Sequence, residues 1–226
     1  MGIFKKALFV AVSGLGVNVA LTVINILQAG SKYPDGRTMK DILGIDPQKA
    51  TADDIARLSR ADCMQLFYAA DVPDFASMKG EFTAKVLPGG VQGKASELFT
   101  HHVFPTGGVT LKTHWEGKAL LPETPTSGYG YNIFSDRSSG SPKVLRLRKF
   151  RTHVGPTTLG KDGRNSLHLV YHDFNTGAVK SMHDEARKIN DNLYICGGYM
   201  ALGGGAINPA PFVLIGPPSE WVGLDK

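Results

Sequence analysis

Cysteine is scarce in this chain: Cys63 and Cys196 are the only two among 226 residues. Two cysteines cannot form a disulfide framework or a four-thiolate zinc site. Charged residues are also few, at 20%, whereas hydrophobic residues make up 42%, and this excludes a disordered polyelectrolyte. No glycine-rich dinucleotide fingerprint follows a strand, and no Gly-x-Ser-x-Gly motif is present. The sequence therefore predicts no cofactor and offers no serine nucleophile.

Positive charge is not gathered on one face of the protein. The formal net charge is +5, and the densest basic run extends from Lys143 to Arg151. Basic and apolar residues alternate within this run, as they do in a strand with one solvated side. Nucleic-acid binding needs a focused basic surface with interleaved aromatic residues. We therefore expect a solvated strand face here and no nucleic-acid partner.

Glycine and proline are abundant, with 27 and 13 residues, and they punctuate segments whose apolar residues recur every second position. This pattern indicates many short strands joined by turns. The predicted strands are 80–87, 99–104, 109–119, 130–134, 143–153, 166–173, 178–184, 193–201 and 212–215. Successive hairpins without helical crossovers favour an antiparallel meander, which hides its edges by closing into a barrel. We predict a mainly β protein with an antiparallel lipocalin-like barrel.

The N-terminal thirty residues resemble a membrane signal. No charge occurs from Ala7 to Ala29, and Lys5 and Lys6 precede this stretch. As a helix it would be long enough to cross a hydrocarbon core of about 30 Å. We predict a single-pass transmembrane anchor over residues 1–30, which contacts the membrane through residues 7–29, with the side of the membrane left open. A cleaved secretory signal and a buried or interfacial helix are the alternatives.

Residues 31–50 are rich in turn-forming residues and are predicted to be a tether. The segment that begins at Thr51 has a helix-capping pattern with Asp54, and apolar residues then recur at helical spacing to Ala70. One or two amphipathic helices are therefore expected before the barrel, with a possible restart at Ser59. Together the helices and the barrel form one predicted domain, residues 51–226.

Several segments resemble the GXWXG family and the domain of unknown function that follows it. The first family motif corresponds to Gly80-Glu81-Phe82-Thr83-Ala84, with Phe and Ala in place of Trp and Gly. The second corresponds to Trp115-Glu116-Gly117-Lys118, and residues 146–148 and 183–200 resemble the following domain. The resemblance covers about residues 59–216. It implies a lipocalin-like β-barrel and does not imply a particular reaction.

An apolar barrel cavity lowers the local dielectric constant, so that a single ionisable side chain inside it can transfer protons. The candidate catalytic residues are His183, Asp184, Arg151 and His114. Arg151 shares its strand parity with Leu145, which would direct it inward. A turn at the surface or a salt bridge at the rim of the barrel would also account for these side chains.

The candidate ligand-binding residues are Trp115, Tyr131, Tyr194, Tyr199 and Met200, which would suit a flat apolar ligand, although such residues are also common in ordinary cores.

The seven histidines lack the carboxylate–histidine spacing of metalloenzymes, and we predict no metal site. His168 and His172 share one strand parity, whereas the apolar residues between them share the other. The two histidines face solvent if the apolar side faces the core, and they face inward if the barrel is polar.

Three functions remain open from the sequence. The first is a membrane-anchored barrel that binds an apolar small molecule or lipid. The second is a cofactor-independent cyclase or isomerase that acts on a hydrophobic polyketide- or terpenoid-like metabolite in the same cavity. Polar side chains that converge on one wall of the cavity would favour the enzyme. The third is a structural subunit of a membrane complex, which predicts a solid barrel interior.

Overall fold

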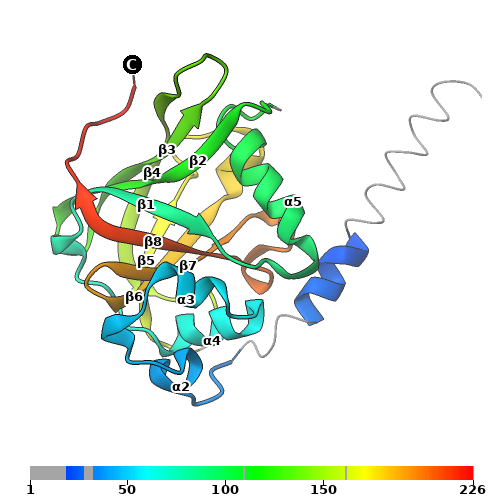
Figure 1. Cartoon of the computed structure of the whole chain (residues 1–226), viewed down its shortest axis with the longest axis vertical. Helices are drawn as coiled ribbons and strands as arrows, with labels where there is room; N and C mark the ends of the chain where they lie inside the picture. The colour runs from blue at the N-terminus through cyan, green and yellow to red at the C-terminus, as the bar shows by residue number, and fades with distance from the viewer. Residues whose placement is uncertain (1–18, 28–32, 109, 161, 226) are drawn as a thin grey trace, which may run out of the picture.

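The computed structural model describes residues 19–27, 33–108, 110–160 and 162–225. Their main feature is a closed barrel in which eight antiparallel strands pair in sequence order and β8 pairs with β1 (Figure 1). The strands are β1 Gly80–Val86, β2 Thr113–Thr124, β3 Ser127–Asp136, β4 Lys143–Pro156, β5 Asn165–Val170, β6 His183–Asn190, β7 Leu193–Tyr199 and β8 Ala210–Ser219. The prediction of a mainly β antiparallel barrel is confirmed.

Short helices pack around the barrel. They are α2 Met39–Leu43, α3 Ala52–Ala56, α4 Arg60–Ala69 and α5 Gly93–Leu98, and a π-helical segment, Phe99–Val103, continues α5. The 3-10 helices are η1 Pro47–Lys49, η2 Phe75–Ser77, η3 Gly90–Gln92, η5 Gly177–Ser181, η6 Ala201–Gly203 and η7 Gly205–Ile207. Two helices follow Thr51, as expected: Thr51 and Asp54 form a capping box on α3, and Ser59 caps α4. The segment predicted as a tether contains α2 and η1.

Two predicted strands are wrong. Residues 99–104 continue α5 as a helix, because Phe99 and Phe104 are spaced to share a helical face and their rings stack. Residues 177–181 form η5, and the strand starts only at His183. In both segments the apolar residues are too few to distinguish a strand from a helical turn by periodicity alone.

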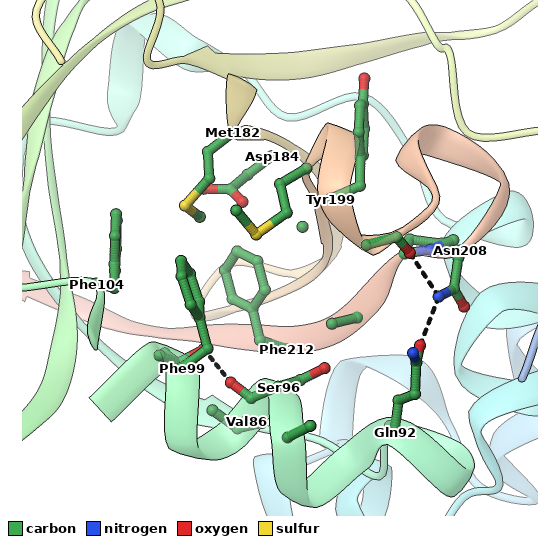
Figure 2. A pocket seen from close by; sticks show the side chains of 18 of the residues that line it. Val86, Gln92, Ser96, Phe99, Phe104, Met182, Asp184, Tyr199, Asn208 and Phe212 are labelled. Atoms are coloured by element: carbon green, nitrogen blue, oxygen red, sulfur yellow. Dashed lines mark hydrogen bonds between the residues drawn. The ribbon is translucent and has the colours of Figure 1, made fainter. Parts of the chain in front are cut away.

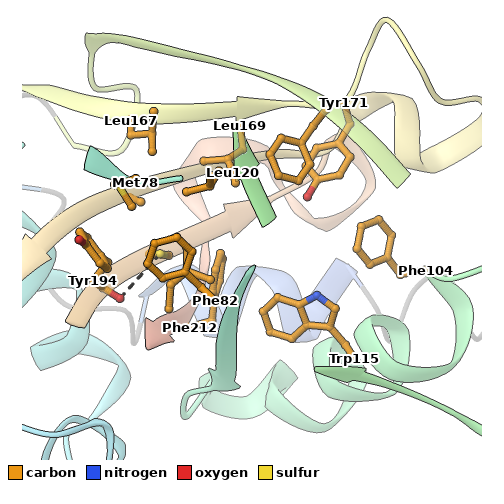
Figure 3. Packing of buried hydrophobic residues seen from close by; sticks show 14 of the residues in the cluster. Met78, Phe82, Phe104, Trp115, Leu120, Leu167, Leu169, Tyr171, Tyr194 and Phe212 are labelled. Carbon is orange, nitrogen blue, oxygen red and sulfur yellow. Dashed lines mark hydrogen bonds between the residues drawn. The ribbon is translucent and has the colours of Figure 1, made fainter. Parts of the chain in front are cut away.

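Two large clusters contain most of the buried apolar side chains of the described residues. One cluster fills much of the barrel interior and includes Phe82, Leu120, Leu169 and Tyr194 (Figure 3). A second cluster lies between the outer face of the barrel and helices α2 to α4, where Phe67 of α4 is fully buried. Helix α4 contacts β7 and β8, and η1 contacts β6, so the helical layer covers this side of the barrel.

Residues 19–27 are helical, and they are the only part of the predicted anchor that lies within the described residues. The Arg60 guanidinium donates to the backbone oxygen of Asn25, at 2.9 Å, and the Asn25 amide donates to Asn208, at 2.8 Å. Gln92 donates to the hydroxyl of Thr22 at 2.6 Å. These contacts hold the helix against the barrel near α5 (Figure 1). Among the described residues, no helix combines the length and apolar character that a membrane crossing requires.

Candidate functional site

A cavity of about 310 Å³ opens at the end of the barrel where α5 lies. Ser96 and Phe99 on the helical side face Met182, Asp184 and Phe212 across the cavity (Figure 2). Further residues of the lining are Asn25, Phe104, Trp115, Lys118, Met200, Leu202, Asn208 and Pro209. The volume is at the lower end of the range for small-molecule pockets, and the lining is mainly apolar, as such pockets usually are.

A β-bulge in β2 explains why Trp115 and Lys118 both line this cavity. Residues three apart on a regular strand point to opposite faces. Here the pairing of β2 with β3 shifts register between Trp115 and Gly117, and the extra residue restores the same inward direction. A Cβ on Gly117 would lie 2.0 Å from the backbone oxygen of Phe82 on β1. Glycine therefore permits the close approach of these two strands.

Lys118 is buried with its ammonium group among three acceptors. Its Nζ donates to Asn132 Oδ1 at 2.7 Å, to the Tyr171 hydroxyl at 2.7 Å and to Asp184 Oδ2 at 2.9 Å. The side chains of Lys118 and Asp184 are each 2% exposed. Five aromatic rings surround the ammonium group, with centroids 5.2–6.0 Å away: Phe104, Trp115, Phe150, Tyr171 and Phe212. A buried charge is tolerated only with such complete pairing.

The hydrogen bonds of this cluster also fix the orientation of Asp184. The Tyr171 hydroxyl donates to Asp184 Oδ2 at 3.0 Å and accepts from the Asn132 amide at 2.9 Å. Burial, and then the Asp184 charge, raises the pKa of Tyr171 well above its usual value. The phenol therefore stays protonated and remains a donor.

One carboxylate oxygen of Asp184 remains available to the cavity. The Tyr171 hydroxyl and the Lys118 ammonium group both contact Oδ2, and Oδ1 has no donor among the described residues. Gly198 makes room for Oδ1, since a Cβ at this position would lie 2.6 Å from it. Asp184 can therefore accept a hydrogen bond, or a proton, from a molecule in the cavity.

Of the four predicted catalytic residues, only Asp184 lines the cavity. His183 is its neighbour on β6 and points to the outer face, where its ring stacks on Tyr199. The alternation of side chains along a strand makes this separation unavoidable.

Arg151 does not point inward as its parity predicts. Arg148 has a positive φ of 59°, and the pairing of β3 with β4 shifts register beside it. The residues beyond this bulge therefore reverse their faces: Phe150 enters the interior cluster and Arg151 turns outward. There Arg151 pairs with Asp173 at 2.5 Å, and both side chains are about half exposed.

His114 also lies outside the cavity. Its ring stacks on His101 at a centroid distance of 3.9 Å, and its Nδ1 lies 3.4 Å from Glu116. His101 accepts a hydrogen bond from the backbone N–H of Trp115 at 3.0 Å. Burial lowers the pKa of His101 to about 4, with further lowering from His114 and His102. The neutral His101 thus remains a hydrogen-bond acceptor and holds the backbone of β2 at the bulge.

The predicted ligand-binding residues divide into two groups. Trp115, Tyr199 and Met200 line the cavity, although the Tyr199 hydroxyl bonds to Thr158 outside the barrel. Tyr131 lies on the outer face, where its hydroxyl donates to Glu81 and its ring packs on Trp221. Tyr194 packs against Phe82 in the interior cluster and is not among the cavity-lining residues.

Sequence reasoning missed Lys118, Asn132 and Tyr171. A lysine directly before an apolar run, Ala119 to Leu121, was a signal for Lys118. Asn132 was also visible as a polar residue between Tyr131 and Ile133.

Comparison with known proteins identified no relatives. No protein-family model matches the chain, and neither the curated proteins nor the solved structures contain a significant match. The site must therefore be interpreted from its own geometry.

Proposed function

We propose that the barrel binds an apolar small molecule or lipid that carries one hydrogen-bond donor, such as a hydroxyl group. The observation that carries this proposal is the mainly apolar cavity with Asp184 Oδ1 as its available acceptor. The apolar part of the ligand would contact Phe99, Phe212 and Met182, and its donor would meet Asp184. The alternative of a structural subunit predicts a solid barrel interior, and the cavity therefore favours ligand binding over it.

The membrane role is part of the same proposal. The uncharged segment 7–29 would anchor the chain in the bilayer, where apolar ligands partition. Helix 19–27 supports this placement, because Asn25 lines the cavity and Val19, Val23 and Leu27 expose 49–78% of their surface. The GXWXG resemblance likewise remains a proposal, supported by the barrel and by the inward direction of both Trp115 and Lys118.

Blocking the cavity is expected to abolish ligand binding. Ser96→Trp would place an indole ring in the cavity from the helical side, whereas Glu97→Trp adds the same ring on an exposed position of α5. Fluorescence titration with N-phenyl-1-naphthylamine, an uncharged apolar probe, should show an affinity at least tenfold weaker for Ser96→Trp. Glu97→Trp should match the wild type. Native mass spectrometry after incubation with a total lipid extract should likewise show less bound lipid on Ser96→Trp than on Glu97→Trp. Equal binding by the two variants would show that the ligand does not occupy this cavity.

A second function, proton transfer within the bound molecule, is favoured by the Lys118–Asp184 pair. Asp184 would act as the general base, with Lys118 compensating its charge, and no cofactor would be required. The reaction class would be a cofactor-independent isomerisation or cyclisation of a hydrophobic metabolite.

Deuterium exchange separates the carrier from the enzyme. A ligand that co-purifies with the protein is incubated in D2O, extracted and returned to H2O, so that only deuterium bound to carbon remains. An enzyme leaves deuterium in the ligand, and Asp184→Asn should abolish this incorporation while the naphthylamine probe still binds. A wild-type protein that returns the ligand without deuterium is a carrier.

A further inference from the structure

The outer face of the barrel carries a second polar cluster, which the proposed function does not use. His168 on β5 and His183 on β6 approach each other, with His168 Nδ1 and His183 Nε2 2.8 Å apart. Glu185, also on β6, places Oε1 3.8 Å from His168 Nδ1. One nitrogen of each imidazole and one oxygen of the carboxylate lie within 4.8 Å of one another. His168 and Glu185 are buried, and His183 is partly exposed.

Hydrogen bonds from neighbouring residues orient two of the three potential ligands, His168 and Glu185. His168 Nε2 lies 3.1 Å from the backbone oxygen of Gly155. A carbonyl oxygen only accepts, so Nε2 carries the proton and the lone pair of Nδ1 faces His183 and Glu185. Metal-binding histidines are commonly oriented by this kind of N–H to carbonyl bond.

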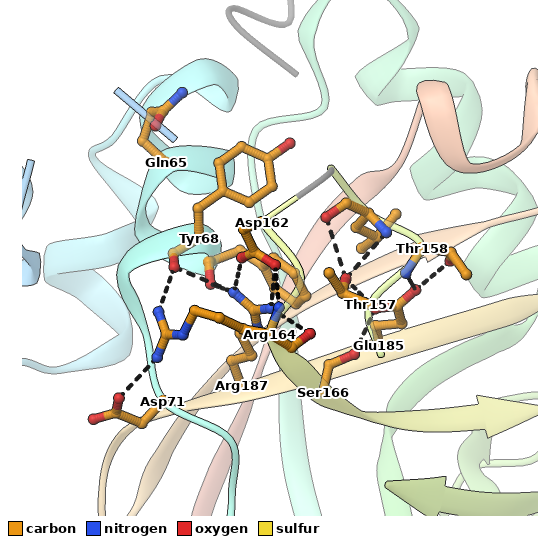
Figure 4. Close-up of polar contacts among 12 residues, drawn as sticks. Gln65, Tyr68, Asp71, Thr157, Thr158, Asp162, Arg164, Ser166, Glu185 and Arg187 are labelled. Carbon is orange, nitrogen blue, oxygen red and sulfur yellow. Dashed lines mark hydrogen bonds and ion pairs between the residues drawn. The ribbon is translucent and has the colours of Figure 1, made fainter. Parts of the chain in front are cut away.

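Glu185 is held equally firmly. Its Oε2 accepts from the hydroxyls of Ser166 at 2.5 Å and Thr157 at 2.6 Å, and its Oε1 accepts from the backbone N–H of Thr158 at 2.9 Å (Figure 4). The Thr158 hydroxyl also donates to Oε1. Thr157 and Thr158 belong to the β4–β5 connection, which covers the carboxylate. These bonds fix the carboxylate in place beside the two imidazoles.

We propose that His168, His183 and Glu185 bind one divalent transition-metal ion, of which Zn²⁺ fits the two-nitrogen, one-oxygen donor set best. A tetrahedral ion with bonds of about 2.0–2.2 Å separates its ligand atoms by about 3.3–3.6 Å. The two imidazole nitrogens must therefore part from their 2.8 Å separation, and Glu185 Oε1 must approach His168 Nδ1 from 3.8 Å. The proton on His183 Nε2 moves to Nδ1, which leaves Nε2 free to coordinate. Three protein ligands leave a fourth position for water.

The sequence alone predicts no metal site because its spacing is not that of a metal motif. His168 lies fifteen residues before His183, and hairpin pairing across β5 and β6 brings them together. Of the two alternatives for this strand, the one with Leu167 and Leu169 facing the interior is correct. His168 is nevertheless buried, because the His153 ring of β4 stacks on it at a centroid distance of 4.6 Å, whereas the His172 side chain is 63% exposed.

The test is metal binding by the full chain, purified without a histidine tag and dialysed against EDTA. Calorimetric titration with Zn²⁺ should give one equivalent per chain, and Co²⁺ should give visible absorption bands of a bound ion. His183→Gln and Glu185→Gln should each weaken Zn²⁺ binding at least tenfold. His172→Gln, which removes an exposed histidine, should bind like the wild type.

Zn²⁺ should also raise the melting temperature of the wild type and of His172→Gln, and it should not raise that of His183→Gln. Circular dichroism of each variant before titration shows that a loss of binding does not come from unfolding. The wild-type titration is decisive by itself, since absence of saturable Zn²⁺ and Co²⁺ binding overturns the proposal. Binding by His183→Gln as tight as that of the wild type also overturns it.

Discussion

Lys118→Met is expected to lower the free energy of unfolding by about 3–5 kcal/mol, the usual cost of removing one partner from a buried ion pair. The substitution leaves the Asp184 carboxylate without its cation, and Asn132 and Tyr171 each lose a donor. Methionine has a similar length, so packing among the surrounding aromatic rings changes little. Urea denaturation followed by tryptophan fluorescence measures the effect.

A second substitution tests whether the loss comes from the unpaired charge. Lys118→Met/Asp184→Asn removes both charges and should recover part of the stability lost in the single variant. Lys85→Met is the matched control, because Lys85 pairs with Asp53 at 2.7 Å with side chains 45% and 75% exposed. Its cost should be about 1 kcal/mol or less. If Lys85→Met and Lys118→Met lower the free energy of unfolding equally, burial of the Lys118–Asp184 pair does not make its disruption more costly.

The barrel could be predicted from the sequence because alternation and turn residues are local signals. The faces of individual strands could not, since the bulges at Trp115–Gly117 and Arg148 reverse the alternation. For this reason the strand parity that Arg151 shares with Leu145 predicts the wrong face, and the spacing of Trp115 and Lys118 does not show that both point inward. Such bulges depend on how neighbouring strands approach each other, and a single strand sequence does not reveal this.

The two polar clusters were hidden for a different reason. Lys118, Asn132 and Asp184 lie on β2, β3 and β6, and Tyr171 directly follows β5. Only closure of the sheet brings them within hydrogen-bond distance. Asp184 ends a predicted strand, whereas the local signals of Lys118 and Asn132, a polar residue beside apolar ones, do not show that the two side chains meet.

Arg187→Met should produce a loss of similar size on the outer face of the barrel. Arg187 has no solvent exposure and forms a two-fold ion pair with Asp162, with distances of 2.5 and 3.1 Å. Its guanidinium also donates to the backbone oxygens of Phe67 and Tyr68 at the end of α4, at 3.2 Å each (Figure 4). We expect a loss of about 3–5 kcal/mol, because Asp162 stays buried without its cation.

Arg164→Met separates this effect from ordinary surface charge. Arg164 also donates to Tyr68 and pairs with Asp71, but its side chain is 43% exposed and that of Asp71 is 70% exposed. Its replacement should lower the free energy of unfolding by about 1 kcal/mol or less.

Hydrogen exchange should show faster exchange of the α4 amides in Arg187→Met than in Arg164→Met, since Arg187 joins α4 to β6 and to the β4–β5 connection. Because Thr157 and Thr158 of this connection hold Glu185, Arg187→Met should also weaken Zn²⁺ binding, whereas Arg164→Met should not. Exchange of the α4 amides as slow in Arg187→Met as in Arg164→Met would contradict a main role of Arg187 in holding α4 on the barrel.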